Sequence, residues 1–183
     1  WERAEQKARE DAAKRGETVD TNELEFQKKN FQILDRQRYF VENSFDFNLE
    51  SVGIYEPREL CRMACAILKF QFDKLAEEIE TRDDLIHNSE TTMDACFDFI
   101  LEHGDYTIGK VLEYILYEKL FVAEGREQIA KFCGFRKMNP HDDHSVIRVS
   151  YVAREAEKGW LKNDLKDACM EASAIFKALR AKF

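Results

Sequence analysis

Alternation of apolar and polar side chains predicts strands at several places along the chain. The stretch SFDFNLES, residues 44–51, alternates three apolar with three polar side chains: Phe45, Phe47 and Leu49 against Asp46, Asn48 and Glu50. A period of two is the pattern of a half-buried strand, and Gly53 ends it. The stretch ACFDFILEH alternates in the same way, and AKFCGFRKM and HSVIRVSYV predict two more short strands.

Apolar spacings of three and four predict three amphipathic helices. The first is long, covers residues 57–80 and starts at Pro57, a residue suited to the first helical turn. The second starts near Thr107, whose side chain we expect to cap it. The third is long again and covers residues 160–182. Their buried stripes are expected to include Ile67, Phe72, Leu112 and Phe176.

The remaining segments set the expected organisation. Residues 1–42 are charged and favour helix, which predicts a helical leader or connector. Residues 83–94 show no periodicity and are expected to form a linker. The order of strands and helices predicts an α+β layer fold, in which long amphipathic helices pack on one face of a small antiparallel sheet.

Composition and charge exclude several classes of protein. Hydrophobic residues make up 44% of the 183 residues, enough for a core, and the net charge is −8. A negative chain with mixed charges argues against direct, sequence-specific contact with DNA. No apolar run is long enough for a membrane span, and no secretory signal is visible. The five cysteines form no CxxC pair, which indicates small buried side chains in a reducing, intracellular compartment.

The stretch NPHDDH, residues 139–144, raises the possibility of a metal site. His141, Asp142 and His144 carry atoms that zinc accepts, and a small metal-dependent hydrolase centred on them is one hypothesis. Pro140 and the strand pattern that follows favour a solvated turn between two antiparallel strands instead. We therefore expect no metal, no cofactor and no catalytic residue in this chain.

Two sequence motifs resemble subunits of a known enzyme. The stretch DYTIGKVL, residues 105–112, resembles the DHTLGNLL motif of the L-like, or eleventh, subunit of archaeal and eukaryotic RNA polymerases. Asp105, Thr107, Gly109 and Leu112 agree with it, whereas tyrosine and lysine replace its histidine and asparagine. The downstream stretch CGFRKMNPHDDHSVIRVSY is similar to a later segment of that family, with Pro140 and Arg148 among the residues in register.

The upstream stretch FDFNLESVG is similar to the end of the D-like, or third, subunit of the same polymerases. There, an F-x-F-x-V-E-S-V-G motif precedes a long helix, and the residues that coincide here are Phe45, Phe47, Glu50, Ser51, Val52 and Gly53. The resemblance divides the chain into residues 43–82, which correspond to the D-like strand and helix, and residues 95–183, which correspond to the L-like dimerisation domain.

The resemblance implies a function in assembly rather than in catalysis. In this family the D-like and L-like subunits pair like the two bacterial α subunits, with an α-subunit-like dimerisation fold, and the pair docks the two large catalytic subunits. Magnesium is expected only in the catalytic subunit. Further expected partners are a small accessory subunit and a separate chain carrying the rest of the D-like half.

The fusion of D-like and L-like elements in one chain is similar to polymerases of some large DNA viruses. It implies viral transcription in the host cytoplasm or nucleus, and possible packaging in the virion. A free-standing α+β interaction module without any polymerase remains a further alternative to the subunit and to the hydrolase.

Overall fold

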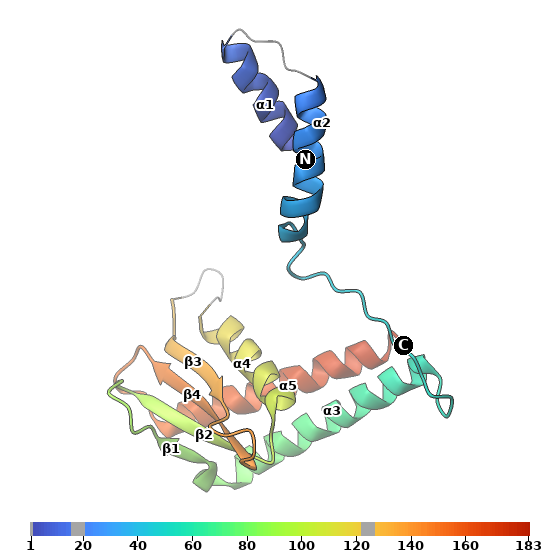
Figure 1. The fold of residues 1–183 in the computed structure, drawn as a ribbon. Helices are drawn as coiled ribbons and strands as arrows, with labels where there is room; N and C mark the ends of the chain where they lie inside the picture. The colour runs from blue at the N-terminus through green and yellow to red at the C-terminus, as the bar shows by residue number, and fades with distance from the viewer. Residues whose placement is uncertain (1, 16–20, 122–126) are drawn as a thin grey trace. The chain divides into compact units, whose positions relative to one another are not determined.

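The computed structural model describes residues 2–15, 21–121 and 127–183, in two compact units, Trp1–Leu49 and Glu50–Phe183. The first unit contains helices α1 (Glu2–Arg15) and α2 (Thr21–Asn30), followed by a π-helical turn and a 3₁₀ turn, Phe31–Asp35 and Arg36–Arg38 (Figure 1). This confirms the helical character expected for the leader. Residues 39–49 of this unit contain neither helix nor strand.

The second unit is a four-stranded antiparallel sheet covered by helices. Its order along the chain is α3 (Pro57–Thr81), β1 (Ile86–Asn88), β2 (Cys96–Glu102), α4 (Tyr106–Leu120), β3 (Ala130–Arg136), β4 (His144–Tyr151) and α5 (Lys158–Arg180). The strand order in the sheet is β1-β2-β4-β3, so β1 and β3 form its edges. This arrangement confirms the predicted α+β class and the two long helices (Figure 1).

One face of the sheet forms the core with the helices. On β2 and β4 every second side chain is buried, and the pairs Phe99–Ile147 and Phe97–Val149 lie opposite each other in the register. The period of two places these strand side chains on one face of the sheet. There they form a single apolar cluster with residues of α3, α4 and α5. The opposite face carries Asp98 and Arg148, as the sequence pattern predicts.

Two expectations about local structure are wrong. Residues 44–50 form no strand among the described residues, and Phe45 and Phe47 are 72% and 90% exposed. Alternation gives a segment the side chains of a strand, but a strand also needs a hydrogen-bonded neighbour, which this segment lacks in the described part of the chain. The supposed linker 83–94 contains a 3₁₀ turn and β1, because Leu85 and Ile86 are buried in the core.

Candidate interaction surface

Helices α3 and α5 pack against each other along their length. Phe72 is fully buried, and its ring stacks on that of Phe176 with centroids 5.7 Å apart. Beside this stack, Ser173 Oγ donates to Asp73 Oδ1 at 2.5 Å, and Lys69 pairs with the same carboxylate. The Lys69 and Ser173 contacts lower the pKa of Asp73. These contacts join two helices that are distant in sequence.

The helix pair also exposes large apolar side chains. On α3, Ile67 is 57% and Phe70 is 66% exposed, although the sequence pattern placed Ile67 on a buried stripe. On α5, Met170, Ile175 and Leu179 are exposed as well. We call these five side chains, which lie at several positions around the two helices, the helix-pair patch. Isolated apolar side chains are normal on a surface, but such a group on two helices packed side by side is typical of an interaction site.

The first turn of α4 is capped by Asp105 rather than by Thr107. The Asp105 carboxylate accepts the Thr107 backbone N–H at 2.9 Å, whereas Thr107 lies inside the helix and is exposed. The expectation that Thr107 is the cap is therefore wrong by two residues. Aspartate is as good a cap as threonine, and its charge also interacts favourably with the helix N-terminus.

Gly109 allows α4 to lie close to strand β3. A Cβ atom on Gly109 would come within 2.0 Å of the Phe135 ring, so no side chain fits there. The ring also packs edge-on against Tyr106, with centroids 5.3 Å apart. The space beside Gly109 is thus filled by an aromatic side chain and not by another backbone.

Glu113 of α4 contacts the edge of the sheet. Its Oε1 accepts the backbone N–H of Phe135 at 3.1 Å, and its other oxygen pairs with Lys110. Nearby, burial and the charge of Glu113 raise the pKa of Cys133 to about 12. Burial likewise raises the pKa of Cys169 to about 12. The raised pKa favours the neutral thiol form of both cysteines at neutral pH.

Arg148 pairs with Asp98 on the sheet face opposite the helices. The guanidinium donates to both carboxylate oxygens, at 2.6 and 2.7 Å, and the two residues are partners in the register of β2 and β4. The hydrogen bonds from Arg148 to Asp98 raise the pKa of Arg148. A bidentate pair fixes the two central strands against each other. Asp98 alternates with apolar residues, so its polarity alone did not reveal this role.

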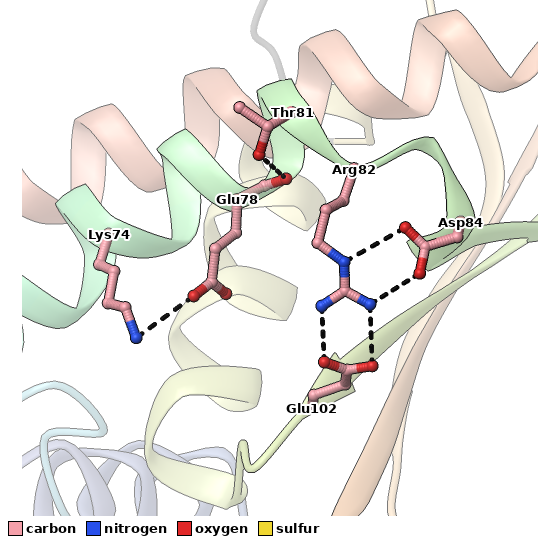
Figure 2. A network of polar contacts seen from close by, with 6 residues as sticks. All are labelled: Lys74, Glu78, Thr81, Arg82, Asp84 and Glu102. Atoms are coloured by element: carbon pink, nitrogen blue, oxygen red, sulfur yellow. Dashed lines mark hydrogen bonds and ion pairs between the residues drawn. The ribbon is translucent and has the colours of Figure 1, made fainter.

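Figure 2 shows that Arg82 fixes the end of α3 to β2. Its guanidinium donates to Glu102 at 2.7 and 3.1 Å and to Asp84 at 2.7 and 3.2 Å. These hydrogen bonds raise the pKa of Arg82 and lower those of both carboxylates. The sequence does not reveal this network, because Glu102 lies 20 residues from Arg82 and the intervening segment shows no periodicity.

Residues 139–143 form the predicted turn between β3 and β4, and His144, which was expected in the turn, is the first residue of β4. Pro140 is exposed, the N–H of Asp142 donates to the carbonyl of Asn139 at 3.0 Å, and that of His141 donates to the Asn139 side chain. A shallow hollow of about 450 Å³ next to the turn is lined by Ile100, Glu102, His103, Asp143 and His144. Within the described ranges, no three His, Cys, Asp or Glu residues are grouped closely enough to hold a metal ion.

The predicted site residues therefore fall into two groups. Those buried in or anchored to the folded domain are Phe72, Gly109, Leu112, Arg148 and Phe176. Those exposed on its surface or in the segment before α3 are Phe45, Phe47, Glu50, Gly53, Ile67, Thr107 and Pro140. Gly53 has φ = 107°, a value that glycine adopts without strain.

Comparison with known proteins assigns no family. The sequence matches none of the protein-family models it was scanned against, and no curated protein matches it either. None of the helices among the described residues is both long and apolar enough to cross a bilayer.

Proposed function

We propose that this chain is a non-catalytic assembly subunit of a DNA-directed RNA polymerase. In this function the helix pair α3–α5 acts as a platform for other subunits. The observation that carries the proposal is the helix-pair patch, in which Ile67 and Phe70 of α3 and three side chains of α5 are exposed on two helices that pack against each other. Such a patch is suited to burial against a partner.

The position of the resembling motifs supports this proposal. The D-like motif leads directly into α3, and the L-like motif forms the start of α4. Asp105 caps α4 and Gly109 fits it against Phe135, so two of the four agreeing positions of the L-like motif have a clear structural role. A motif whose residues serve packing rather than catalysis agrees with an assembly subunit.

A second exposed surface suits a further subunit. Three tyrosines of α4 are exposed, Tyr106, Tyr114 and Tyr117, by 57%, 65% and 44%. Tyrosine is enriched at protein interfaces because it combines a large apolar ring with a polar tip. We infer that large catalytic subunits dock on the helix-pair patch and that a D-like chain covers these tyrosines. Nucleotidyl transfer with magnesium would then take place in the catalytic subunit.

Purification of the tagged chain from its native source tests the proposal. The expected result is stoichiometric recovery of large RNA polymerase subunits, identified by mass spectrometry. Ile67→Asp combined with Phe70→Asp should lose them, because two charges would enter a buried interface. Gln71→Asp, an exposed polar position on the same helix, is the matched control and should retain them. A wild-type chain that recovers no polymerase subunits, or a double variant that binds them normally, contradicts the proposal.

A further inference from the structure

Residues 44–50 show the alternation of apolar and polar side chains that is typical of a strand, but they pair with no strand among the described residues. Phe45, Phe47 and Leu49 alternate with polar residues, and all three are exposed, Phe47 by 90%. None of the sheet pairings in the described part of the chain includes this segment. An extended segment of this kind is suited to joining the edge of a sheet, where backbone hydrogen bonds give affinity and alternate side chains give specificity.

Strand β3 offers such an edge in the same protein. It lies at one end of the sheet order, and it is seven residues long, like the segment 44–50. The outward N–H of Phe135 donates to the Glu113 carboxylate rather than to a strand. The register with β4 places Gly134 and Arg136 on the sheet face away from the helices, and Cys133 and Phe135 on the helix face.

The two segments carry opposite charges. Residues 42–50 contain three acidic residues and no basic one, Glu42, Asp46 and Glu50. Residues 130–137 contain three basic residues and no acidic one, Lys131, Arg136 and Lys137. In a chain with a net charge of −8, a basic edge strand and an acidic strand-like segment are complementary partners.

The position of α3 favours pairing between two copies of the chain. Glu50 precedes Pro57 by seven residues, which span at most about 25 Å when extended. Helix α3 begins at the end of the helix pair that lies away from the sheet (Figure 1). It is 25 residues long, and its buried residues other than Cys65 lie in its second half, against the core. This reach from the far end of the helix pair favours a second copy as the partner of the segment.

We propose that residues 44–50 of one copy pair antiparallel with β3 of a second copy, in a reciprocal dimer. The register that aligns both charge and face places Asp46 beside Arg136 and Phe47 beside Phe135. The apolar residues then extend the helix face of the sheet, and the Phe47 carbonyl replaces the Glu113 carboxylate on the N–H of Phe135. This inference does not depend on the proposed polymerase function.

Sedimentation velocity of the full chain, over about a hundredfold range of concentration at low salt, tests this dimer. The wild type should pass from monomer to dimer. Asp46→Lys with Glu50→Lys should weaken the dimer about tenfold, and Lys131→Glu with Arg136→Glu should do the same. All four substitutions in one chain should restore it, because the charges are then exchanged. Glu2→Lys with Glu25→Lys, exposed positions on α1 and α2, is the control for the pair Asp46→Lys with Glu50→Lys, because it changes the net charge in the same direction and by the same amount.

Hydrogen exchange resolved to single amides provides a second readout. In the proposed register the N–H groups of Phe47 and Leu49 point to β3, so they should be protected at high concentration, whereas those of Asp46 and Asn48 should exchange freely. A chain that stays monomeric overturns the proposal, as does a fourfold variant that fails to recover or a control pair that weakens the dimer equally. Protection that does not change with concentration indicates pairing within one chain and also overturns it.

Discussion

The ring of Phe72 on α3 lies parallel to that of Phe176 on α5, with 10° between their planes and 5.7 Å between their centroids. The two residues are separated by more than 100 positions, so this contact joins the upstream helix to the end of the chain. Because Phe72 is fully buried while Phe176 is only partly buried, the two rings contribute unequally to stability.

Truncation of this stack should separate the two contributions. Phe72→Ala is expected to lower the free energy of unfolding by about 3–5 kcal/mol, because it leaves a cavity in the core. Phe176→Ala should cost about half as much, because part of its ring already contacts water. Urea unfolding measures both. Phe70→Ala, on the same helix with 66% of the side chain exposed, is the control and should change stability by no more than about 0.5 kcal/mol.

Gly109 should not tolerate a side chain as long as Phe135 is present. Gly109→Ala would normally favour a helix by about 1 kcal/mol, but its methyl group would meet the Phe135 ring at 2.0 Å. We expect the clash to dominate and to lower the melting temperature. Phe135→Leu should recover part of the loss when combined with Gly109→Ala, whereas alone it should only destabilise. A Gly109→Ala variant that melts higher than the wild type contradicts this account.

The cap of α4 gives a prediction that distinguishes neighbouring residues. Asp105→Ala removes the acceptor for the Thr107 N–H and should cost about 1 kcal/mol of unfolding free energy. Thr107→Ala should cost less than about 0.5 kcal/mol, because Thr107 is exposed and its side chain does not cap the helix. Asp105→Asn should retain most of the stability. Equal losses for Asp105→Ala and Thr107→Ala would contradict the assignment of the cap.

Asp164 should make the protein less stable as the pH rises. Burial raises the pKa of Asp164 above its usual value of 3.8, although Tyr151, which donates to the carboxylate at 2.6 Å, opposes the rise. A raised pKa means that the folded state binds the proton more tightly. The stability that Asp164 contributes is therefore fully present below the pKa of this carboxyl in the unfolded chain. It is lost as the pH rises through the pKa of the carboxyl in the folded protein.

The variant Asp164→Asn removes this titration. Compared with the wild type, it should gain relative stability between about pH 4 and pH 7, measured by urea unfolding at both values. Glu155→Gln, at an exposed acid before the same helix that is not among the groups acting on Asp164, is the control and should follow the wild type. A variant whose stability relative to the wild type is the same at both pH values would show that Asp164 does not titrate differently in the folded state.

Periodicity was sufficient to predict the elements that bury one face. Helices α3 and α5 were expected within two residues of their observed starts, and β2, β3, β4 and the turn at Pro140 were all predicted. Periodicity was not sufficient where an element depends on pairing with another segment of the chain. Residues 44–50 have the alternation of a strand but no neighbour in the described chain, whereas β1 has almost no pattern and is held by its pairing with β2.

The candidate surface was predicted less well than the fold, for a related reason. A sequence pattern shows that Ile67 is apolar and on a helix, but not which apolar positions the other elements cover. Ile67 proved exposed, whereas Phe72 five residues later is buried. The contacts of Arg82 with Glu102 and of Glu113 with the Phe135 N–H join segments 20 and 22 residues apart, which local spacing cannot reveal.

The sheet order β1-β2-β4-β3 has a consequence for synthesis of the chain on the ribosome. Strand β2 is paired on one side only with the three-residue β1 until β4 has emerged, since Asp98 pairs with Arg148, which lies 50 positions further along the chain. Helix α3 lacks its packing partner for longer still, because α5 follows every strand of the sheet. The nascent chain therefore exposes Phe72, Phe97 and Phe99 until α5 has been made, and folding of the domain depends on contacts between segments far apart in the sequence.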